Sequence, residues 1–284
     1  VPAGAVPPLL PAVQGAADAP ETIGTDAGVV HFGIDTAKAR YRGWQVWGYL
    51  DHERNQLSGV ESVRMDVGDG RDVTVELARS SQALRSFSAA GVPYAVSELA
   101  DEAAFDGRST QLTVDGLPLW VRQWHPAPGV YARASVSART DTGLTVAVQA
   151  LRLNEARRCA APVRLSDLPS GANLQGCLVD VSAFPKLLTA RFTISGPDPL
   201  AEMTVSYLYE AEAAVSSVAG NMKINGRAAL LYPNGGRLEL LGFPKSHLLA
   251  NYGSPEHGFD QRDAAVVLGG AHVAPDPTRP ETWD

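Results

Sequence analysis

The sequence predicts an α+β fold of two tandem pseudo-symmetric units, each a curved antiparallel sheet with one or two helices. Three observations predict it: an internal repeat, short period-2 strands separated by Asp-Gly or Asn-Gly turns, and a capped helix late in each half. The chain has 284 residues, of which 45% are hydrophobic. That length and composition suffice for two ordinary domains with buried cores.

The repeat is the most specific feature of the chain. Residues 106–148 align without a gap on 225–267, at an offset of 119, and share eight identities. Turn residues fall on turn residues, since Asp106-Gly107 aligns with Asn225-Gly226. Because a repeat of this length corresponds to a whole small domain, we expect the two halves to fold alike.

Composition places the domain boundaries. Residues 1–28 are rich in Pro, Ala and Gly and are expected to form a linker. Residues 29–155 form the first α+β unit. Residues 156–274 form the second, which opens with a Pro/Gly-rich joining loop. Residues 275–284 form a Pro-rich tail.

In the first unit, apolar residues alternate with polar ones at Val63, Met65 and Val67, as in a half-buried strand, and a Gly-Asp-Gly turn follows. The helix of this unit begins at Asp141, a residue type favoured at helix N-caps. The expected elements, in order, are an apolar run at 29–34, strands at 44–50, 63–67 and 73–77, a helix at 80–90, strands at 117–124 and 130–136, and a helix ending near Leu151.

The second unit repeats this plan. A hairpin is expected around the turn 195–199, and the helix begins at Asp260 and closes at Gly269-Gly270. The expected strands lie at 178–181, 190–194, 203–208, 225–232 and 236–242.

Charge and hydropathy exclude several classes of function. The net charge is −7, and the chain has four Lys beside twenty Arg. An acidic protein lacks the basic face that nucleic acids or anionic membranes require. No apolar stretch approaches the roughly 20 residues that span a bilayer, so membrane attachment is expected only through a segment N-terminal to Val1. The excess of Arg over Lys favours a high-GC genome, such as that of an actinobacterium or one of its phages.

Cys159 and Cys177 flank the joining loop, which has little strand or helix pattern. A disulfide is expected here, because an oxidised pair that closes such a loop stabilises a secreted domain. The alternative is two buried thiols that pack as small apolar groups. No CxxC motif is present, which argues against zinc.

The segments "NGRAALLYPNGGRLELLGF", "RRCAAPVRLSDLPSGANLQGC" and "APDPTRPETWD" resemble those of extracytoplasmic domains of uncharacterised actinobacterial single-pass membrane proteins. Each strand–helix unit is also similar to LolA/RseB-like secreted domains, in which a curved sheet wraps a helix over an apolar concavity. These resemblances imply an envelope location, anchoring to the cytoplasmic membrane with secretion as the alternative, and no catalytic residue.

Three patterns that could carry chemistry have simpler interpretations. Asp141-Thr142-Gly143 matches an aspartic-protease motif but precedes an amphipathic helix, so we expect a helix cap. Asp66, Asp69 and Asp72 lack the spacing and terminal Glu of a calcium loop. His52, between Asp51 and Glu53, could hold a metal but is expected in a polar loop. No metal-ligand, nucleophile-elbow or phosphate-loop motif is present, so neither catalytic residue, metal nor cofactor is expected.

Aromatic residues of the first unit form the candidate binding site: Trp44, Trp47, Trp120, Trp124 and Tyr131. Trp120 and Trp124 share one strand face, opposite Leu119 and Val121, and the repeat places Glu239 where the first unit has Trp120. An exposed aromatic face suits a protein partner, a glycan or an apolar ligand. The alternative is that these rings pack against a helix or against the other unit.

The function that follows is a non-enzymatic extracytoplasmic binding or sensing module, which recognises a protein partner or an apolar or glycan ligand in the envelope. Two other hypotheses remain open. One is a hydrolase with a site in a cleft between the units. The other is a structural subunit of a surface assembly or virion, with Pro-rich ends that dock onto neighbours.

Overall fold

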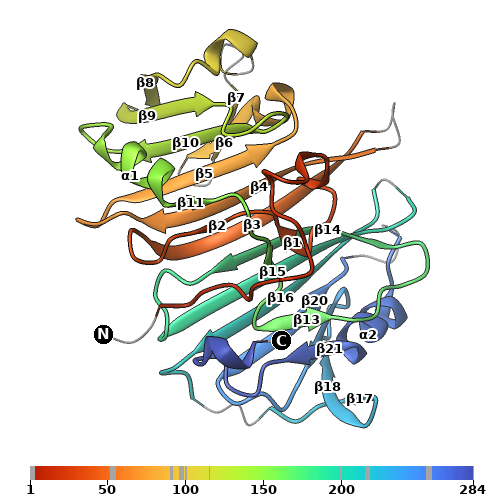
Figure 1. Cartoon of the computed structure of the whole chain (residues 1–284). Coiled ribbons are helices and arrows are strands. Elements are labelled where there is room, and N and C mark those ends of the chain that lie inside the picture. The colour runs from red at the N-terminus through yellow and green to blue at the C-terminus, as the bar shows by residue number, and fades with distance from the viewer. Residues whose placement is uncertain are drawn as a thin grey trace. The chain divides into compact units, whose positions relative to one another are not determined.

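The computed structural model describes residues 4–51, 56–89, 92–95, 99, 101–114, 116–198, 200–214, 218–253 and 258–283. These residues form mostly antiparallel sheet together with two α-helices, so the α+β class is confirmed in broad terms (Figure 1). The chain divides into two compact units. One comprises Leu9–Arg158, and the other comprises Val1–Pro8 with Cys159–Asp284.

The unit Leu9–Arg158 contains an antiparallel sheet with the strand order β3-β4-β5-β10-β9-β8. The strands are β3 (Arg40–Asp51), β4 (Gln56–Asp66), β5 (Asp72–Ala78), β8 (Ser109–Val114), β9 (Leu117–Trp124) and β10 (Tyr131–Ser137). Short pairs join β1 (Val29–Val30) to β12 (Arg157–Arg158), β2 (Gly33–Ile34) to β11 (Leu151–Arg152), and β6 (Ser86–Ala89) to β7 (Val92–Ala95). The helices are η1 (Pro20–Thr22), η2 (Ser81–Leu84), η4 (Glu102–Ala104) and α1 (Thr142–Ala150).

Helix α1 lies against one face of this sheet, which we call the helix-bearing face. A Cβ atom on Gly143 would lie 3.3 Å from a methyl group of Val73 and 4.0 Å from one of Val136. Val73, Val75 and Leu77 of β5 point to this face and are fully buried. Small and β-branched residues therefore allow the helix to pack closely on the sheet.

Residues 9–28 differ from the expected linker, because they pack into the first unit. Ala16 and Ile23 are fully buried. The carboxylate of Glu61, on β4, accepts hydrogen bonds from the backbone N–H groups of Gly24 and His31, at 2.7 and 2.5 Å, and contacts His31 Nδ1 at 2.6 Å. Pro/Ala/Gly content did not imply mobility here, because a buried acid supplies the backbone with hydrogen bonds.

Described residues of the long connection 79–108 pack on the opposite face of the sheet. Leu99 packs with Leu119 and Val121 in one cluster, and Leu84 and Phe105 pack with Ala78 in another. The expected helix at 80–90 is wrong: a single turn, η2, is followed by the extended strand β6. The guanidinium of Arg133 donates to the carbonyl oxygen of Leu84, an acceptor that a longer helix would need for itself.

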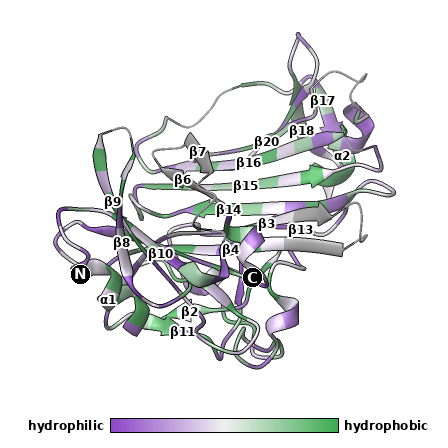
Figure 2. Cartoon of the chain, turned by 90° about the horizontal axis from the view of Figure 1, so that it is seen from above, coloured by the Kyte–Doolittle hydropathy of each residue, from purple (hydrophilic) through white to green (hydrophobic). Residues whose placement is uncertain are grey.

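The unit formed by 1–8 and 159–284 contains an antiparallel sheet with the order β14-β15-β16-β20-β19-β18-β17 (Figure 2). The strands are β14 (Asn173–Asp180), β15 (Leu187–Ser195), β16 (Glu202–Glu210), β17 (Met222–Ile224), β18 (Arg227–Leu231), β19 (Arg237–Leu240) and β20 (Ser246–Asn251). β13 (Val163–Leu165) pairs with β21 (Ala271–Val273), and the helices are α2 (Gln261–Gly269) and η6 (Pro280–Thr282).

Most expected elements of this unit occur where the sequence predicts them. Asp260 caps α2 through a capping box with Asp263, and α2 ends beside Gly270. The tail is packed, because the indole of Trp283 is 4% exposed and meets the ring of Phe184 edge-on at 6.1 Å. A tail rich in Pro can therefore bury its aromatic end on its own unit.

The two units share part of their order of elements. Each has three successive antiparallel strands, and a returning strand pairs with the third before the helix follows. α1 and α2 are offset by 119 residues at both ends, since 142 and 150 correspond to 261 and 269. The hairpin register is also kept, because Leu112 opposite Leu119 corresponds to Leu231 opposite Leu238.

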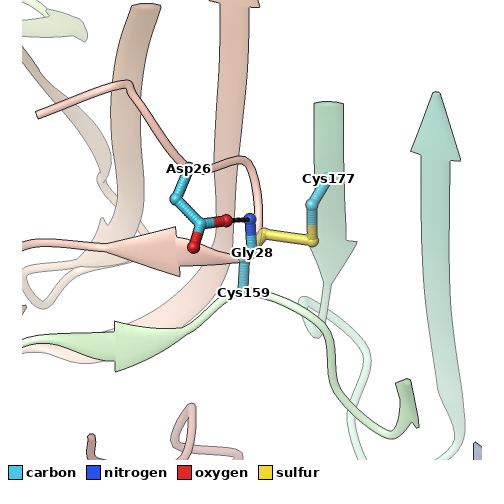
Figure 3. Close-up of a disulfide and its surroundings, with 4 residues drawn as sticks. All are labelled: Asp26, Gly28, Cys159 and Cys177. Atoms are coloured by element: carbon cyan, nitrogen blue, oxygen red, sulfur yellow. Dashed lines mark hydrogen bonds between the residues drawn. A yellow bond between two sulfur atoms is a disulfide. The ribbon is translucent and has the colours of Figure 1, made fainter. Parts of the chain in front are cut away.

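Cys159 and Cys177 form a disulfide, as expected (Figure 3). Both cysteines are buried and belong to the same unit, and the bridge joins the start of this unit's main segment to β14. No helix among the described residues is long and apolar enough to cross a membrane.

We expect the double substitution Cys159→Ala/Cys177→Ala to lower the free energy of unfolding by about 3 kcal/mol, because the unfolded chain gains the freedom of an open loop. Urea denaturation measures the change. Reductant should destabilise the wild type by a similar amount and leave the variant unaffected. A wild type with equal stability in oxidising and reducing buffer contradicts this prediction.

Candidate functional site

The five aromatic residues of the predicted site lie on two different faces of one sheet. Directly opposite residues on neighbouring strands share a face. Trp120 lies opposite Val136 and Trp124 opposite Ala132, so both point to the helix-bearing face. Trp44 pairs with Val63 and shares this face. Trp47 pairs with Val60 and Tyr131 pairs with Ala78, so both point to the other face of the sheet. A single binding surface cannot contain all five.

Trp44 belongs to the core. Its side chain is buried, 2% exposed, and packs edge-on against the ring of Tyr41 with centroids 5.7 Å apart. The Tyr41 hydroxyl accepts a hydrogen bond from Ile34 N–H, and burial raises the pKa of this phenol to about 12. Trp44 therefore holds β3 against the N-terminal segment and does not contact solvent.

Trp120 and Trp124 flank Arg122 on β9, and we call these three residues the Trp-Arg-Trp stripe. All three side chains are half-buried, whereas Leu119 and Val121 on the other face are buried. The indole N–H of Trp120 is buried and has no hydrogen-bond partner among the described residues. The stripe therefore combines partly exposed apolar area with a guanidinium, which is a combination typical of binding surfaces.

Arg122 is held in position within the stripe. Its guanidinium donates from Nε and Nη2 to the Ser109 hydroxyl on β8, at 3.3 and 3.1 Å. Nη2 also lies 4.0 Å from a carboxylate oxygen of Asp141, at the start of α1. These contacts fix the direction of the cation, and the distance to Asp141 leaves its charge only weakly compensated.

The comparison of Trp120 with Glu239 does not relate equivalent positions. Trp120 points to the helix-bearing face of its unit. In the other unit, α2 contacts β19 and β20, whose buried side chains include Leu238 and Leu248, and Glu239 points to the opposite face. The 119-residue register therefore preserves the hairpin but reverses its faces relative to the helix. The residue Glu239 therefore gives no information about the exposure of Trp120.

Glu239 is instead the centre of a separate polar cluster. Its carboxylate accepts a hydrogen bond from the Tyr232 hydroxyl at 2.7 Å and contacts His247 Nδ1 at 2.6 Å. The hydrogen bond to Glu239, followed by burial, raises the pKa of Tyr232. Because Glu239 is 6% exposed, these partners satisfy a carboxylate that would otherwise be buried alone.

Tyr131 lies in an aromatic cluster with Phe105 and His125. The centroid of its ring is 5.2 Å from that of Phe105 and 4.6 Å from that of His125. Glu102 contacts both the Tyr131 hydroxyl, at 3.3 Å, and His125 Nε2, at 3.2 Å. Burial, followed by the hydrogen bond and charge of Glu102, raises the pKa of Tyr131. The cluster packs residues of the connection 79–108 against β10. It offers only one imidazole and one carboxylate, which are too few ligands to hold a metal ion.

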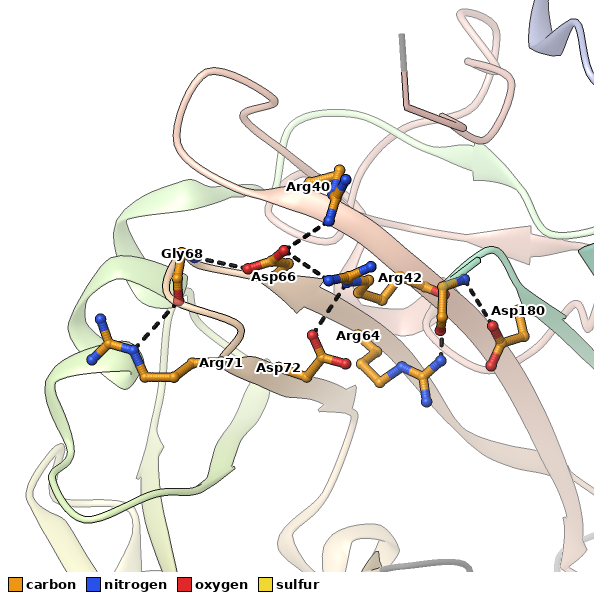
Figure 4. A network of polar contacts seen from close by, with 9 residues as sticks. Arg40, Arg42, Arg64, Asp66, Gly68, Arg71, Asp72 and Asp180 are labelled. Carbon is orange, nitrogen blue, oxygen red and sulfur yellow. Dashed lines mark hydrogen bonds and ion pairs between the residues drawn. The ribbon is translucent and has the colours of Figure 1, made fainter. Parts of the chain in front are cut away.

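The acidic turn after β4 is an ion-pair network (Figure 4). Asp66 Oδ2 contacts the guanidinium groups of Arg40 and Arg42, each at 2.9 Å, and Asp66 Oδ1 accepts from Gly68 N–H. Arg42 Nε also lies 3.3 Å from Asp72. Burial alone would raise the pKa of Asp66, but the Gly68 hydrogen bond and the two arginines outweigh it and lower that pKa. The carboxylates that a calcium ion would need are thus occupied by arginine.

The remaining sequence motifs show no reactive arrangement where the structure describes them. Asp141 occupies the N-cap position of α1 without a side-chain capping bond. His52 and His257 lie outside the described residues. Within the described ranges, no group of three His, Cys, Asp or Glu side chains is placed to hold a metal.

The structure contains a cavity that the sequence does not predict. It has a volume of about 420 Å³ and lies in the unit formed by 1–8 and 159–284, beside the docked tail. Its lining residues come from three separate stretches of sequence, around Pro185, Tyr209 and Pro280. No local pattern predicts such a site, because it exists only where the tail docks.

No family model and no curated protein matches the chain. Solved structures similar to it include a crystal structure of MucB in complex with MucA(peri), with 13% identity over 82% of this chain and 93% of that one, and a TM-score of 0.25. Another is the Pseudomonas aeruginosa MucA/MucB complex, with 13% identity over 91% and 98%, and a TM-score of 0.27. At these low scores neither complex assigns a function or a site to this chain, and the LolA/RseB-like resemblance stays a prediction.

Asp66→Asn should destabilise the protein by about 1–3 kcal/mol at neutral pH, because two guanidinium groups lose their charged acceptor. A carboxyl with a lowered folded-state pKa contributes stability above its unfolded pKa and loses it as the pH falls. The difference from wild type should therefore shrink below about pH 4. Urea denaturation across pH 2–7 tests this, with the 86% exposed Asp69→Asn as control. An Asp66→Asn effect that is constant over this range contradicts the assignment.

Trp44→Ala should lower the free energy of unfolding by about 3–5 kcal/mol, because it empties a packed core position. Trp124→Ala should cost no more than roughly 1–2 kcal/mol, since its side chain is only partly buried. Urea titrations of the two variants give the comparison. Equal losses would show that the stripe is core and not surface.

Proposed function

We propose that this chain is a non-enzymatic extracytoplasmic binding module that recognises a protein partner through the Trp-Arg-Trp stripe. The observation that carries the proposal is the stripe itself, in which two half-buried indoles flank a positioned guanidinium on one strand face. Trp and Arg are the residue types most enriched at the energetic centres of protein interfaces. A glycan or an apolar ligand is the alternative occupant of the same surface.

The extracytoplasmic location rests on redox chemistry. The Cys159–Cys177 disulfide is buried and joins the start of the segment 159–284 to β14. Reducing cytoplasms keep cysteine pairs open, whereas oxidising compartments preserve them. Anchoring to the cytoplasmic membrane remains a prediction, as do the actinobacterial origin, the hydrolase with a site between units and the assembly subunit.

We further infer that the two units are duplicated, pseudo-symmetric copies that have diverged in how their sheets are covered. The shared strand order, the conserved hairpin register and the helices at an offset of 119 support this inference. In the first unit, the apolar side of the β8–β9 hairpin lies beneath Leu99 of the connection 79–108. The stripe lies on the other side of the hairpin, away from Leu99.

The double variant Trp120→Ala/Trp124→Ala should lose binding to the partner, because it removes both apolar anchors while leaving Arg122 in place. The whole 284-residue chain is used as bait for envelope extract, and each captured protein is purified and titrated by calorimetry. A loss of about 100-fold or more in affinity is expected for a central pair of tryptophans. Leu117→Ala is the matched control, since Leu117 is 61% exposed on the same strand and outside the stripe.

Indole N–H signals in NMR spectra give a second readout. Partner or glycan binding at the stripe should shift the Trp120 signal and leave that of the buried Trp44 unchanged. A partner that binds the double variant as tightly as wild type, with an unshifted Trp120 signal, removes the stripe as the site. Shifts produced by cell-wall oligosaccharides alone would instead support the glycan alternative.

A further inference from the structure

The cavity beside the C-terminal tail has the composition of a small-ligand site. Its volume of about 420 Å³ falls within the range of ligand pockets. Aromatic, proline and alanine side chains form most of its wall, namely Phe184, Pro185, Tyr209, Ala211 and Pro280. The other four lining residues are polar: Lys186, Thr278, Arg279 and Glu281. An apolar wall with a few charged groups is the usual design of a pocket for an amphipathic molecule.

The tail that forms one wall is fixed in place. Trp283 is buried and packs on Phe184, and Thr282 donates from its hydroxyl to the Asp276 carbonyl at 2.9 Å. Asp276 in turn accepts from the Thr278 N–H at 2.9 Å and from the Thr278 hydroxyl at 2.7 Å. These hydrogen bonds lower the pKa of Asp276 and keep its carboxylate charged. Residues 276–283 therefore form an ordered wall.

Charge at the cavity favours an anion. Arg279 bonds Glu281 through Nε alone, at 2.8 Å, and no described residue bonds its terminal amino groups. Lys186 lies 3.9 Å from Glu212, with both side chains about four-fifths exposed, so that pair is weak. The lining residues Lys186, Arg279 and Glu281 together carry one net positive charge, which the nearby carboxylates of Asp276 and Glu212, outside the lining, reduce. Arg279 presents a fork of N–H donors that fits an acidic head group.

We propose that this cavity binds a small amphipathic acid, with its apolar body between Phe184, Tyr209 and the two prolines and its acidic group on Lys186 and Arg279. The site lies in a different unit from the Trp-Arg-Trp stripe and does not depend on it. Carboxylates and sulfonates share the required chemistry, which is one negative charge at the end of an apolar group.

The probe is 8-anilinonaphthalene-1-sulfonate, whose fluorescence rises in apolar surroundings. Its neutral counterpart, N-phenyl-1-naphthylamine, carries the same rings without the charge. We expect one saturable sulfonate site per full-length chain, competed by octanoate but not by octanol. Sulfonate affinity should fall with added salt, because the two cations are partly exposed.

Substitutions at the cavity separate its two recognition elements. Lys186→Gln/Arg279→Gln should weaken sulfonate binding about tenfold or more while changing binding of the neutral probe about twofold at most. Ala211→Phe should weaken both probes, because it fills the cavity. The matched control is Lys223→Gln/Arg262→Gln, which removes the same charge at exposed positions of the same unit.

Trp120→Ala/Trp124→Ala should leave sulfonate binding unchanged, which distinguishes this site from the stripe. NMR should show a shift of the Trp283 indole signal on adding octanoate, because Trp283 packs on the Phe184 wall. The proposal is overturned if the wild type has no saturable sulfonate site. It is equally overturned if the Lys186/Arg279 variant binds sulfonate as the wild type does, or if the control variant loses it to the same extent.

Discussion

The buried carboxylate of Glu61 is the constraint on which the first unit depends. It is fully buried in β4 and accepts hydrogen bonds from the backbone N–H groups of Gly24 and His31. It also contacts the imidazole of His31. A buried acid without such partners would be strongly destabilising, so the strand and the segment can only be stable together. This pairing holds the N-terminal segment against the helix-bearing face at β4, and α1 lies against β5 on the same face. The same face stays accessible at β9, where Trp120 and Trp124 are half-buried.

A cation has the corresponding role on the other face of the same sheet. The guanidinium of Arg133 is fully buried, donates from Nε to Glu76 at 2.7 Å and donates to the carbonyl oxygen of Leu84. Gln123 adds a hydrogen bond from its amide to the Leu99 carbonyl at 2.8 Å. Polar side chains thus direct the connection 79–108 across the sheet, and the apolar contacts of Leu84 and Leu99 follow. On both faces, hydrogen bonds between buried side chains and the backbone fix the segment that packs on the sheet.

This explains how two halves with the same hairpin register can expose different surfaces. The alternation of apolar residues in 106–124 and 225–243 only requires that one side of each hairpin be buried. In one unit the connection buries that side, through Leu99 against Leu119 and Val121. In the other, α2 packs on β19 and β20. The stripe and the tail cavity therefore depend on the covering segments, which differ between the two units.

The sequence by itself determined the local structure. Period-2 alternation and Gly-containing turns located most strands, Asp260 located α2, and the spacing of Cys159 and Cys177 indicated the disulfide, because each is a property of neighbouring residues. The tertiary structure decided what covers each face: the burial of residues 9–28, the single turn η2 followed by strand β6, the separation of Trp44 and Tyr131 from the stripe, and the cavity beside Pro280. Those outcomes depend on single long-range hydrogen bonds, such as that from Gly24 to Glu61, and on a docked tail, and neither leaves a periodic pattern in the chain.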